Sequence, residues 1–365
     1  MPEPVRSPHF SDPLVYPAAE KDQWFDSPFL APRGICAVDD WLFLSDTAQN
    51  QVFCWRTDAD GMPIDDSLIF LKGDTIGTTT ASSLQYPSGI WSDGKKLVIA
   101  DAWNHRVLIW HTMPTACHQP ADTIIGQTDP AGAEINRSGE INSPRADSLY
   151  WPYGVHSDGK SLWIADTGNR RILHYATIPE KHGASADLVL GQPDFKIRDH
   201  NSRFFPWPYS VKIGPNGQMI VSDPSTFRIN YWQNWRNAGN LDHEPTCVLG
   251  QRNAADGLQN LGGFSASAES MNWCYDAYFF KRGIIVADTG NSRLLEWLTV
   301  PTKNATPADF VLGQDSFNAS AESSSLFHQK KDNFYWPFSI SLTPSFLWVA
   351  DTGNNRIVRY RVNKS

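Results

Sequence analysis

One short phrase recurs six times along this chain, and that repetition restricts the fold more than any other feature. It reads ADTG in three copies, as in IADTGNRRILHY from Ile164, and takes variant forms in the other three. Its aspartates follow one another at intervals of 55 to 65 residues: Asp46, Asp101, Asp166, Asp223, Asp288 and Asp351. An aromatic residue stands nine positions after each: Trp55, Trp110, Tyr175, Trp232, Trp297 and Tyr360. An arginine stands five positions after each, except in the first copy, where Gln51 replaces it. Fixed offsets of this kind indicate a repeat architecture.

Each copy divides into four short strand-like segments. The third copy shows them as WPYGVHSDG, then LWIAD, then RILHY, then ADLVLGQ, with turn-forming residues between the segments. Six four-stranded units at this period predict an all-β fold, a six-bladed β-propeller with four antiparallel strands per blade.

The two ends of the chain predict how the ring closes. The sequence ends at RIVRYRVNKS, shortly after a third strand, so the sixth blade lacks its fourth strand. Near the beginning, SDPLVYP is similar to the fourth-strand segment ADLVLGQP. We therefore expect residues around 12–16 to complete the last blade, which makes 1–365 a single domain.

The repeated phrase resembles the NHL repeat, and the chain resembles bacterial NHL-repeat propellers from about residue 29 onward. The resemblance implies a six-bladed propeller and, in function, a binding platform like those that NHL relatives provide in signalling and RNA regulation. Related six-bladed folds include lactonases and amidating lyases, so the resemblance does not name an activity.

Composition narrows the classes of function. The chain has 365 residues and a formal net charge of −8, which argues against a general nucleic-acid binder. It has no run of 18 apolar residues and no leader pattern at its start, so we expect a cytoplasmic protein with no membrane span. Its five cysteines form no CxxC pair and no zinc spacing, which predicts reduced, mostly buried thiols.

Positions that agree in all copies are interpreted as scaffold. The repeated Asp and Arg flank a tight turn, and we expect them to brace that turn by hydrogen bonds and charge pairing. The asparagines of the turn suit a position with positive φ: Asn104, Asn169, Asn291 and Asn354.

Positions that deviate along the first strand of each blade are the functional candidates, because this strand lies nearest the channel. The residue before the proline is aromatic in five copies, and we expect it to pack between blades: Tyr86, Trp151, Trp207, Trp273 and Trp336. The residue after the proline supplies a candidate ligand-binding cluster: Arg33, Tyr153, Tyr209, Tyr275 and Phe338. Three positions further on, channel-facing residues differ in every copy: Cys36, Trp91, His156, Lys212, Tyr278 and Ser341. Of these, Trp91 and Tyr278 are further candidate ligand-binding residues.

The connections from fourth to first strand include three long loops, which cover 128–149, 252–270 and 315–334. Strand alternation places these loops on one face of the propeller, around the mouth with the aromatic residues. We therefore expect this long-loop face to bind a protein partner or a small ligand.

A channel-centred hydrolase or lyase, lactonase-like, is the alternative. It would use Asp276, which replaces the small residue of the other blades, together with His156 and Lys212. A divalent cation such as Ca²⁺ is a possible cofactor of this alternative, with Asp276 as its ligand. No other cofactor is evident. Lactonase-type propellers hold calcium with several acidic residues in the channel, whereas this chain aligns only Asp276 there, so the match to that family is weak. The histidines share no register for zinc.

Overall fold

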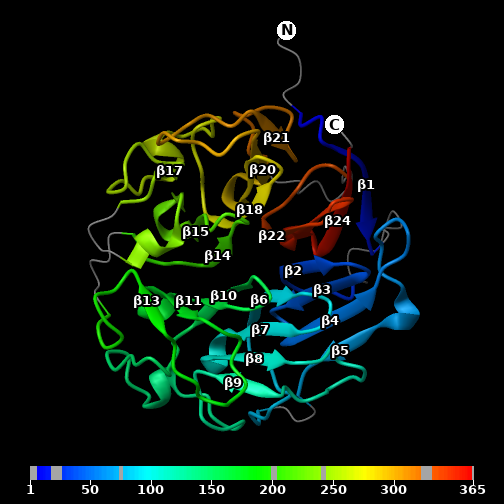
Figure 1. The fold of residues 1–365 in the computed structure, drawn as a ribbon. Helices are drawn as coiled ribbons and strands as arrows, with labels where there is room; N and C mark the ends of the chain where they lie inside the picture. The colour runs from blue at the N-terminus through cyan, green and yellow to red at the C-terminus, as the bar shows by residue number, and fades with distance from the viewer. Residues whose placement is uncertain are drawn as a thin grey trace.

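The structure, a computed structural model, describes residues 6–17, 27–73, 77–198, 204–239, 244–321 and 331–363. Within them, strands form six antiparallel four-stranded sheets arranged around a central axis (Figure 1). The innermost strand of each sheet lies near the axis and the fourth strand near the rim. The predicted six-bladed β-propeller is confirmed.

Blades 1 to 3 take their strands in chain order. Blade 1 contains β2 (Pro32–Val38), β3 (Trp41–Asp46), β4 (Gln51–Arg56) and β5 (Ile69–Leu71). Blade 2 contains β6 (Pro87–Ser92), β7 (Leu97–Asp101), β8 (Arg106–Trp110) and β9 (Thr123–Ile125). Blade 3 contains β10 (Pro152–Ser157), β11 (Leu162–Asp166), β12 (Arg171–Tyr175) and β13 (Leu188–Leu190).

Blades 4 and 5 follow the same pattern, and blade 6 borrows a strand. Blade 4 contains β14 (Ser210–Ile213), β15 (Met219–Asp223), β16 (Arg228–Trp232) and β17 (Cys247–Leu249). Blade 5 contains β18 (Cys274–Phe280), β19 (Gly283–Asp288), β20 (Arg293–Trp297) and β21 (Phe310–Leu312). Blade 6 contains β22 (Pro337–Leu342), β23 (Phe346–Asp351), β24 (Arg356–Val362) and β1 (Phe10–Tyr16).

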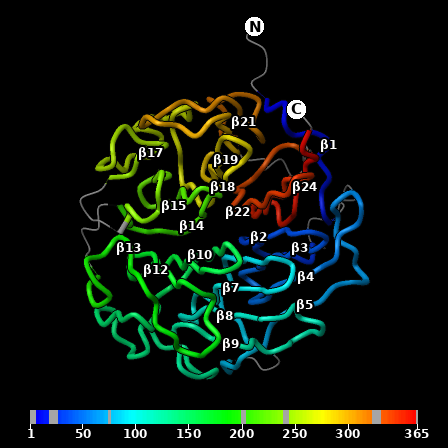
Figure 2. Tube along the Cα trace, in the orientation of Figure 1, coloured from blue at the N-terminus to red at the C-terminus, as the bar shows by residue number. Residues whose placement is uncertain are grey.

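Strand β1 closes the ring as predicted. It pairs antiparallel with β24, from Phe10 opposite Val362 to Tyr16 opposite Ile357, so the first strand of the chain is the outer strand of the last blade. Figure 2 shows β1, in blue, beside β24, in red, at this blade. The pairing fastens the ring without a covalent bond.

Short 3-10 helices connect the strands. Five of them follow the second strand of a blade: η3 (Ala102–Asn104), η5 (Thr167–Asn169), η6 (Pro224–Thr226), η9 (Thr289–Asn291) and η10 (Thr352–Asn354). The others within the described residues lie in longer connections: η2 (Asp65–Ser67), η4 (Ile135–Arg137), η7 (Trp235–Gly239) and η8 (Gln259–Gly262). No helix of the described residues is long and apolar enough to cross a membrane.

The hydrophobic core is divided into six clusters, each between two neighbouring blades. Between blades 3 and 4, for example, Trp163 and Ile172 pack with Val211 and Trp232, all almost fully buried. The aromatic residue nine positions after each repeated Asp is buried in one of these clusters. Burial of side chains this large supplies most of the favourable free energy of a propeller ring.

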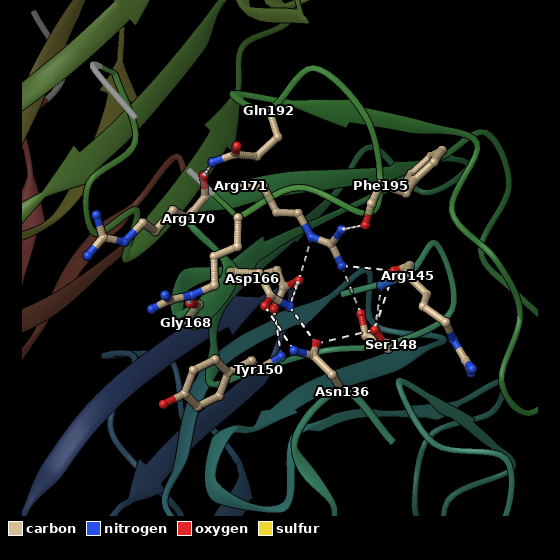
Figure 3. Close-up of polar contacts among 12 residues, drawn as sticks. Asn136, Arg145, Ser148, Tyr150, Asp166, Gly168, Arg170, Arg171, Gln192 and Phe195 are labelled. Carbon is tan, nitrogen blue, oxygen red and sulfur yellow. Dashed lines mark hydrogen bonds and ion pairs between the residues drawn. The ribbon is translucent and has the colours of Figure 1, made fainter. Parts of the chain in front are cut away.

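In blades 2, 3, 5 and 6 the repeated Asp and Arg form a buried, hydrogen-bonded hub that holds the start of the blade, as predicted. In blade 3, Asp166 accepts hydrogen bonds from the Tyr150 backbone N–H at 2.7 Å and from Arg171 Nε at 2.7 Å (Figure 3). The same guanidinium donates to the carbonyls of Arg145 at 2.9 Å, Ser148 at 3.1 Å and Phe195 at 2.8 Å. One side chain therefore fixes the loops that precede and follow its own blade.

In the four copies that carry a threonine after the repeated Asp, this threonine links its blade to the next. Ala102 and Pro224 take its place in blades 2 and 4. Thr167 Oγ1 donates to the Pro208 carbonyl at 2.5 Å, and Thr289 Oγ1 donates to the Pro337 carbonyl at 2.6 Å. Thr352 makes the equivalent bond to Pro32 across the point of ring closure. The repeated phrase therefore sets the contact between blades as well as the turn inside each blade.

The prediction that the turn asparagines have positive φ is wrong, because the residue after each asparagine has it instead. The left-handed conformation belongs to the following residue, with φ of 52° at His105, 57° at Arg170 and 53° at Ser292. The asparagine side chain instead donates to the repeated carboxylate, as from Asn169 Nδ2 to Asp166 Oδ2 at 2.8 Å. Its hydrogen bond, rather than its tolerance of positive φ, explains its place in the repeat.

We expect Arg171→Lys to lower the free energy of unfolding by about 2–4 kcal/mol, because lysine keeps the charge but leaves buried carbonyls without donors. Urea unfolding followed by circular dichroism would measure the loss. Gln51→Ala, at the position where blade 1 lacks the arginine, should cost less than about 1 kcal/mol. Equal losses in the two variants would contradict the role assigned to the hub.

Candidate functional site

The inner strands line a central channel whose two ends differ. Each inner strand begins at the face that carries the long loops and ends at the opposite face, where the turns between first and second strands lie. In five blades the pairing of first and second strands shifts by one residue near the start, as between Pro152 and Gly154. This bulge turns the residue after the proline toward the channel.

Four aromatic side chains from those positions fill the long-loop end of the channel. Tyr153 stacks on Tyr209 with ring centroids 4.9 Å apart, Tyr209 meets Tyr275 edge-on at 4.7 Å, and Tyr275 stacks on Phe338 at 4.3 Å. Burial raises the pKa of Tyr153 to about 12, so its phenol stays neutral at physiological pH. The cluster predicted at these positions therefore exists as one continuous array.

Arg33 completes the array from blade 1. Its guanidinium carbon lies 4.6 Å from the centre of the Phe338 ring and 5.3 Å from that of Tyr86, and its Nη1 donates to the Tyr86 hydroxyl. A planar cation over aromatic faces is favourable even when partly desolvated. Beneath the array remains a void of about 30 Å³, too small for an organic ligand.

Two of the five aromatic residues before the proline do not pack as expected, whereas Trp151 and Trp207 contact each other across blades 3 and 4. Packing between blades was predicted, but Trp273 is 47% exposed and Trp336 is 37% exposed. Four of these residues adopt positive φ: Tyr86 at 56°, Trp151 at 49°, Trp273 at 48° and Trp336 at 53°. The left-handed backbone turns the side chain away from the gap between blades and onto the rim of the channel mouth.

Sequence comparison missed one member of this rim, Trp103. It stacks on Tyr86 with centroids 4.6 Å apart and planes 4° from parallel, and it is 46% exposed. It replaces the glycine of the repeated phrase, and at Gly168 a Cβ atom would meet the Tyr150 ring at 2.5 Å. Blade 2 has Gln85 in place of that tyrosine, so the deviation from glycine was a usable signal.

Asp276 is buried and fully engaged. It forms an ion pair with Lys212, with Oδ1 3.5 Å from Nζ, and its Oδ2 accepts from Ser339 Oγ at 2.8 Å and from the Ile340 N–H at 3.2 Å. These contacts join blades 4, 5 and 6. Nowhere in the described residues do three or more His, Cys, Asp or Glu side chains gather in a way that could hold a metal ion.

His156 and Lys212 lie on the walls of a chamber of about 430 Å³ at the end of the channel opposite the long loops. Cys36, Trp91 and Tyr278 line the same chamber, so the positions that differ in every copy do share one cavity. Asp276 lines only the void under the aromatic array, and Lys212 lies between the two spaces. Asp276 and His156 therefore do not share one cavity.

Burial sets the protonation of the chamber. It lowers the pKa of His156 to about 3, with the Lys212 charge acting in the same direction, and it raises the pKa of the Cys36 thiol to about 11. At neutral pH the chamber presents a neutral imidazole and a neutral thiol.

No known family profile matches the chain, and no curated protein matches its sequence. Among solved structures, it is similar to a protein of unknown function from Bacteroides thetaiotaomicron VPI-5482, with 12% identity and a TM-score of 0.53 over 96% of this chain and 72% of that chain. Kuenenia stuttgartiensis hydrazine synthase has 11% identity and a TM-score of 0.52 over 93% and 97%. Virginiamycin B lyase from Staphylococcus aureus has 11% identity and a TM-score of 0.50 over 97% and 100%.

The likeness is one of fold. At these identities the shared propeller carries no information about activity. The NHL resemblance stays a prediction that rests on the repeated phrase.

We expect the wild-type protein to lose more stability than His156→Gln when the pH falls from 7 to 4. The pKa of His156 is about 3 in the folded protein and about 6.5 in the unfolded chain. Between these two pH values the unfolded state therefore binds more protons than the folded state. Stability is therefore fully present above this range and falls on acidification, by at most about 1.4 kcal/mol per pH unit for this group. Urea unfolding of both proteins at several pH values would show the difference, and parallel curves would contradict it.

Proposed function

We propose that this protein is a binding platform that recognises a protein partner across its long-loop face. The observation that carries the proposal is the distribution of exposed apolar side chains. In the described residues, eleven large hydrophobic side chains are exposed, and eight of them belong to this face. The eight are Leu30, Trp103, Ile141, Ile197, Leu258, Phe264, Trp273 and Trp336. Single exposed apolar side chains are normal, but gathering on one face is typical of interaction surfaces.

Backbone strain at the rim supports the same function. A bulky residue at positive φ costs about 1–3 kcal/mol, and four aromatic residues of the rim hold that conformation. Backbone contacts hold it in place: the Trp151 N–H donates to His105 Nδ1 at 3.2 Å, and the Tyr86 N–H donates to Asn50 Oδ1 at 2.9 Å.

The filled channel mouth favours a macromolecular partner over a small ligand on this face. The aromatic array and Arg33 leave only the void of about 30 Å³ beneath them. A ligand of this face must therefore lie across the rim instead of entering the channel. Trp is the residue type that most often dominates the binding energy of protein interfaces, and three exposed tryptophans surround the mouth.

A channel-centred hydrolase or lyase is the second candidate, because His156 and Lys212 line one chamber. Its support is weaker, since Asp276 is occupied by Lys212, Ser339 and the Ile340 backbone and lies outside the chamber. Turnover of an ester or lactone that disappears in His156→Gln would favour this candidate.

We expect the double variant Trp103→Ala/Trp336→Ala to lose at least tenfold in affinity for a partner of the long-loop face. Its stability should change little, because both side chains are more than a third exposed. Proteins captured from the source cell by immobilised wild type and variant would be identified by mass spectrometry, and the affinity of each candidate measured by biolayer interferometry.

The matched control is Leu188→Ala, an equally exposed apolar residue on the outer strand β13. It should bind like the wild type. Partners that the double variant retains with unchanged affinity would contradict the proposed surface.

A further inference from the structure

The chamber at the opposite end of the channel has the properties of a second, separate binding site. Its volume of about 430 Å³ lies in the range of small-molecule sites. It opens among the turns between first and second strands, which include Asp39 and Thr343. The aromatic array closes the channel between this chamber and the long-loop face. A ligand held here would not reach the proposed platform, so the two sites can be tested independently.

Two aromatic side chains line the chamber from opposite blades. Trp91 comes from blade 2 and Tyr278 from blade 5, and these blades lie on opposite sides of a six-bladed ring (Figure 2). Burial raises the pKa of Tyr278, so its ring stays uncharged at physiological pH. Aromatic side chains that line a cavity from two sides favour a planar ligand.

Lys212 supplies hydrogen-bond donors from blade 4. Its ammonium has three N–H groups, and the described residues give it one ionic contact, with Asp276 at 3.5 Å. The Tyr278 ring centre lies 5.4 Å from Nζ, which keeps the ammonium beside the aromatic wall. Its remaining donors are available to an acceptor in the chamber.

His156 supplies an acceptor from blade 3, the blade next to that of Lys212. Burial and the Lys212 charge lower the pKa of its imidazole to about 3, so the ring is neutral. The Ile213 backbone beside the ring acts in the opposite direction, as a carbonyl that faces an imidazole N–H does. The second ring nitrogen of the neutral imidazole is then an acceptor. The two neighbouring blades therefore supply a donor and an acceptor to the same chamber.

The charge of the chamber argues against an organic acid. Asp276 already neutralises Lys212, and the acidic Asp39 stands at the opening. A carboxylate would meet a compensated cation and a like charge at the entrance. An uncharged ligand can use the same ammonium as a hydrogen-bond donor without this penalty.

We propose that the chamber binds an uncharged planar heterocycle whose edge carries a carbonyl next to an N–H group. The carbonyl accepts from Lys212, the N–H donates to His156, and the ring lies between Trp91 and Tyr278. Purine and pyrimidine bases and related bicyclic lactams belong to this chemical class. The site holds the ligand by shape and by one donor–acceptor pair, and it includes no covalent step.

Isothermal titration calorimetry with hypoxanthine as the probe tests the site. Hypoxanthine should bind the wild-type protein, and 1-methylhypoxanthine, which keeps the carbonyl but lacks the adjacent N–H, should bind at least tenfold more weakly. This comparison uses no variant, so it does not depend on the folding of one. Benzoate, which is planar and anionic, should bind at least tenfold more weakly than hypoxanthine.

Variants then locate the binding. Trp91→Leu and His156→Phe should each weaken hypoxanthine binding at least tenfold, while Trp103→Leu, on the long-loop face, should bind within twofold of the wild type. The proposal is overturned if hypoxanthine gives no binding at millimolar concentration, if benzoate binds as tightly, if N-methylation has no effect, or if neither chamber variant has an effect. Partner binding should follow the opposite pattern, unchanged in Trp91→Leu, so failure of one proposal is distinguishable from failure of the other.

Discussion

The buried pairing of the repeated aspartate with the arginine five residues later is the interaction on which the rest of the structure depends. In blade 2, Asp101 accepts from Arg106 Nε at 2.6 Å and from the Gln85 N–H at 2.6 Å, and the arginine bonds loop carbonyls on both sides of its blade. Where the long loops are buried against the blades, their backbone N–H and C=O groups need hydrogen-bond partners. One guanidinium with five donors satisfies several of them at once, so the loops can be long and still begin and end in fixed places. Blade 1 shows the limit of this rule: Asp46 accepts from the Leu30 and Ala31 N–H groups and from Gln49 Nε2. Gln51, at the position of the arginine, donates to Gln49 instead.

Because these bonds fix the blades, the residues that line the channel can differ from blade to blade. The two ends of the channel accordingly have different linings. Residues directly after the proline meet as an aromatic array with Arg33 and close the long-loop end. Residues three positions further along the same strands line an open chamber of about 430 Å³. Three positions along the same strands thus separate the residues of the aromatic array from those of the open chamber. Lys212 and Asp276 lie at the boundary and hold it with an ion pair at 3.5 Å.

Much of the candidate site followed from internal comparison of the six copies, and the exceptions have physical causes. The need of Asp276 for a partner was foreseeable, because a carboxylate replaces a small residue there, and Lys212 and Ser339 provide it. The exposure of Trp273 and Trp336 was not foreseeable, because it follows from a left-handed backbone at a position where aromatic residues rarely adopt one. The separation of His156 from Asp276 was equally hidden, since the two lie in different spaces of one channel.

By itself, the sequence determined the number of blades, the order of strands, the closing strand β1 and the structural role of the repeated phrase. These follow from local periodicity and from residue types at fixed offsets, which act over a few residues or between adjacent strands. Only the tertiary structure decided which end of the channel is closed, which tryptophans face solvent and which polar groups share a cavity. Those properties depend on how side chains from all six blades pack together in the central channel. The blades are distant in sequence, so the packing cannot be read from any single copy of the repeat.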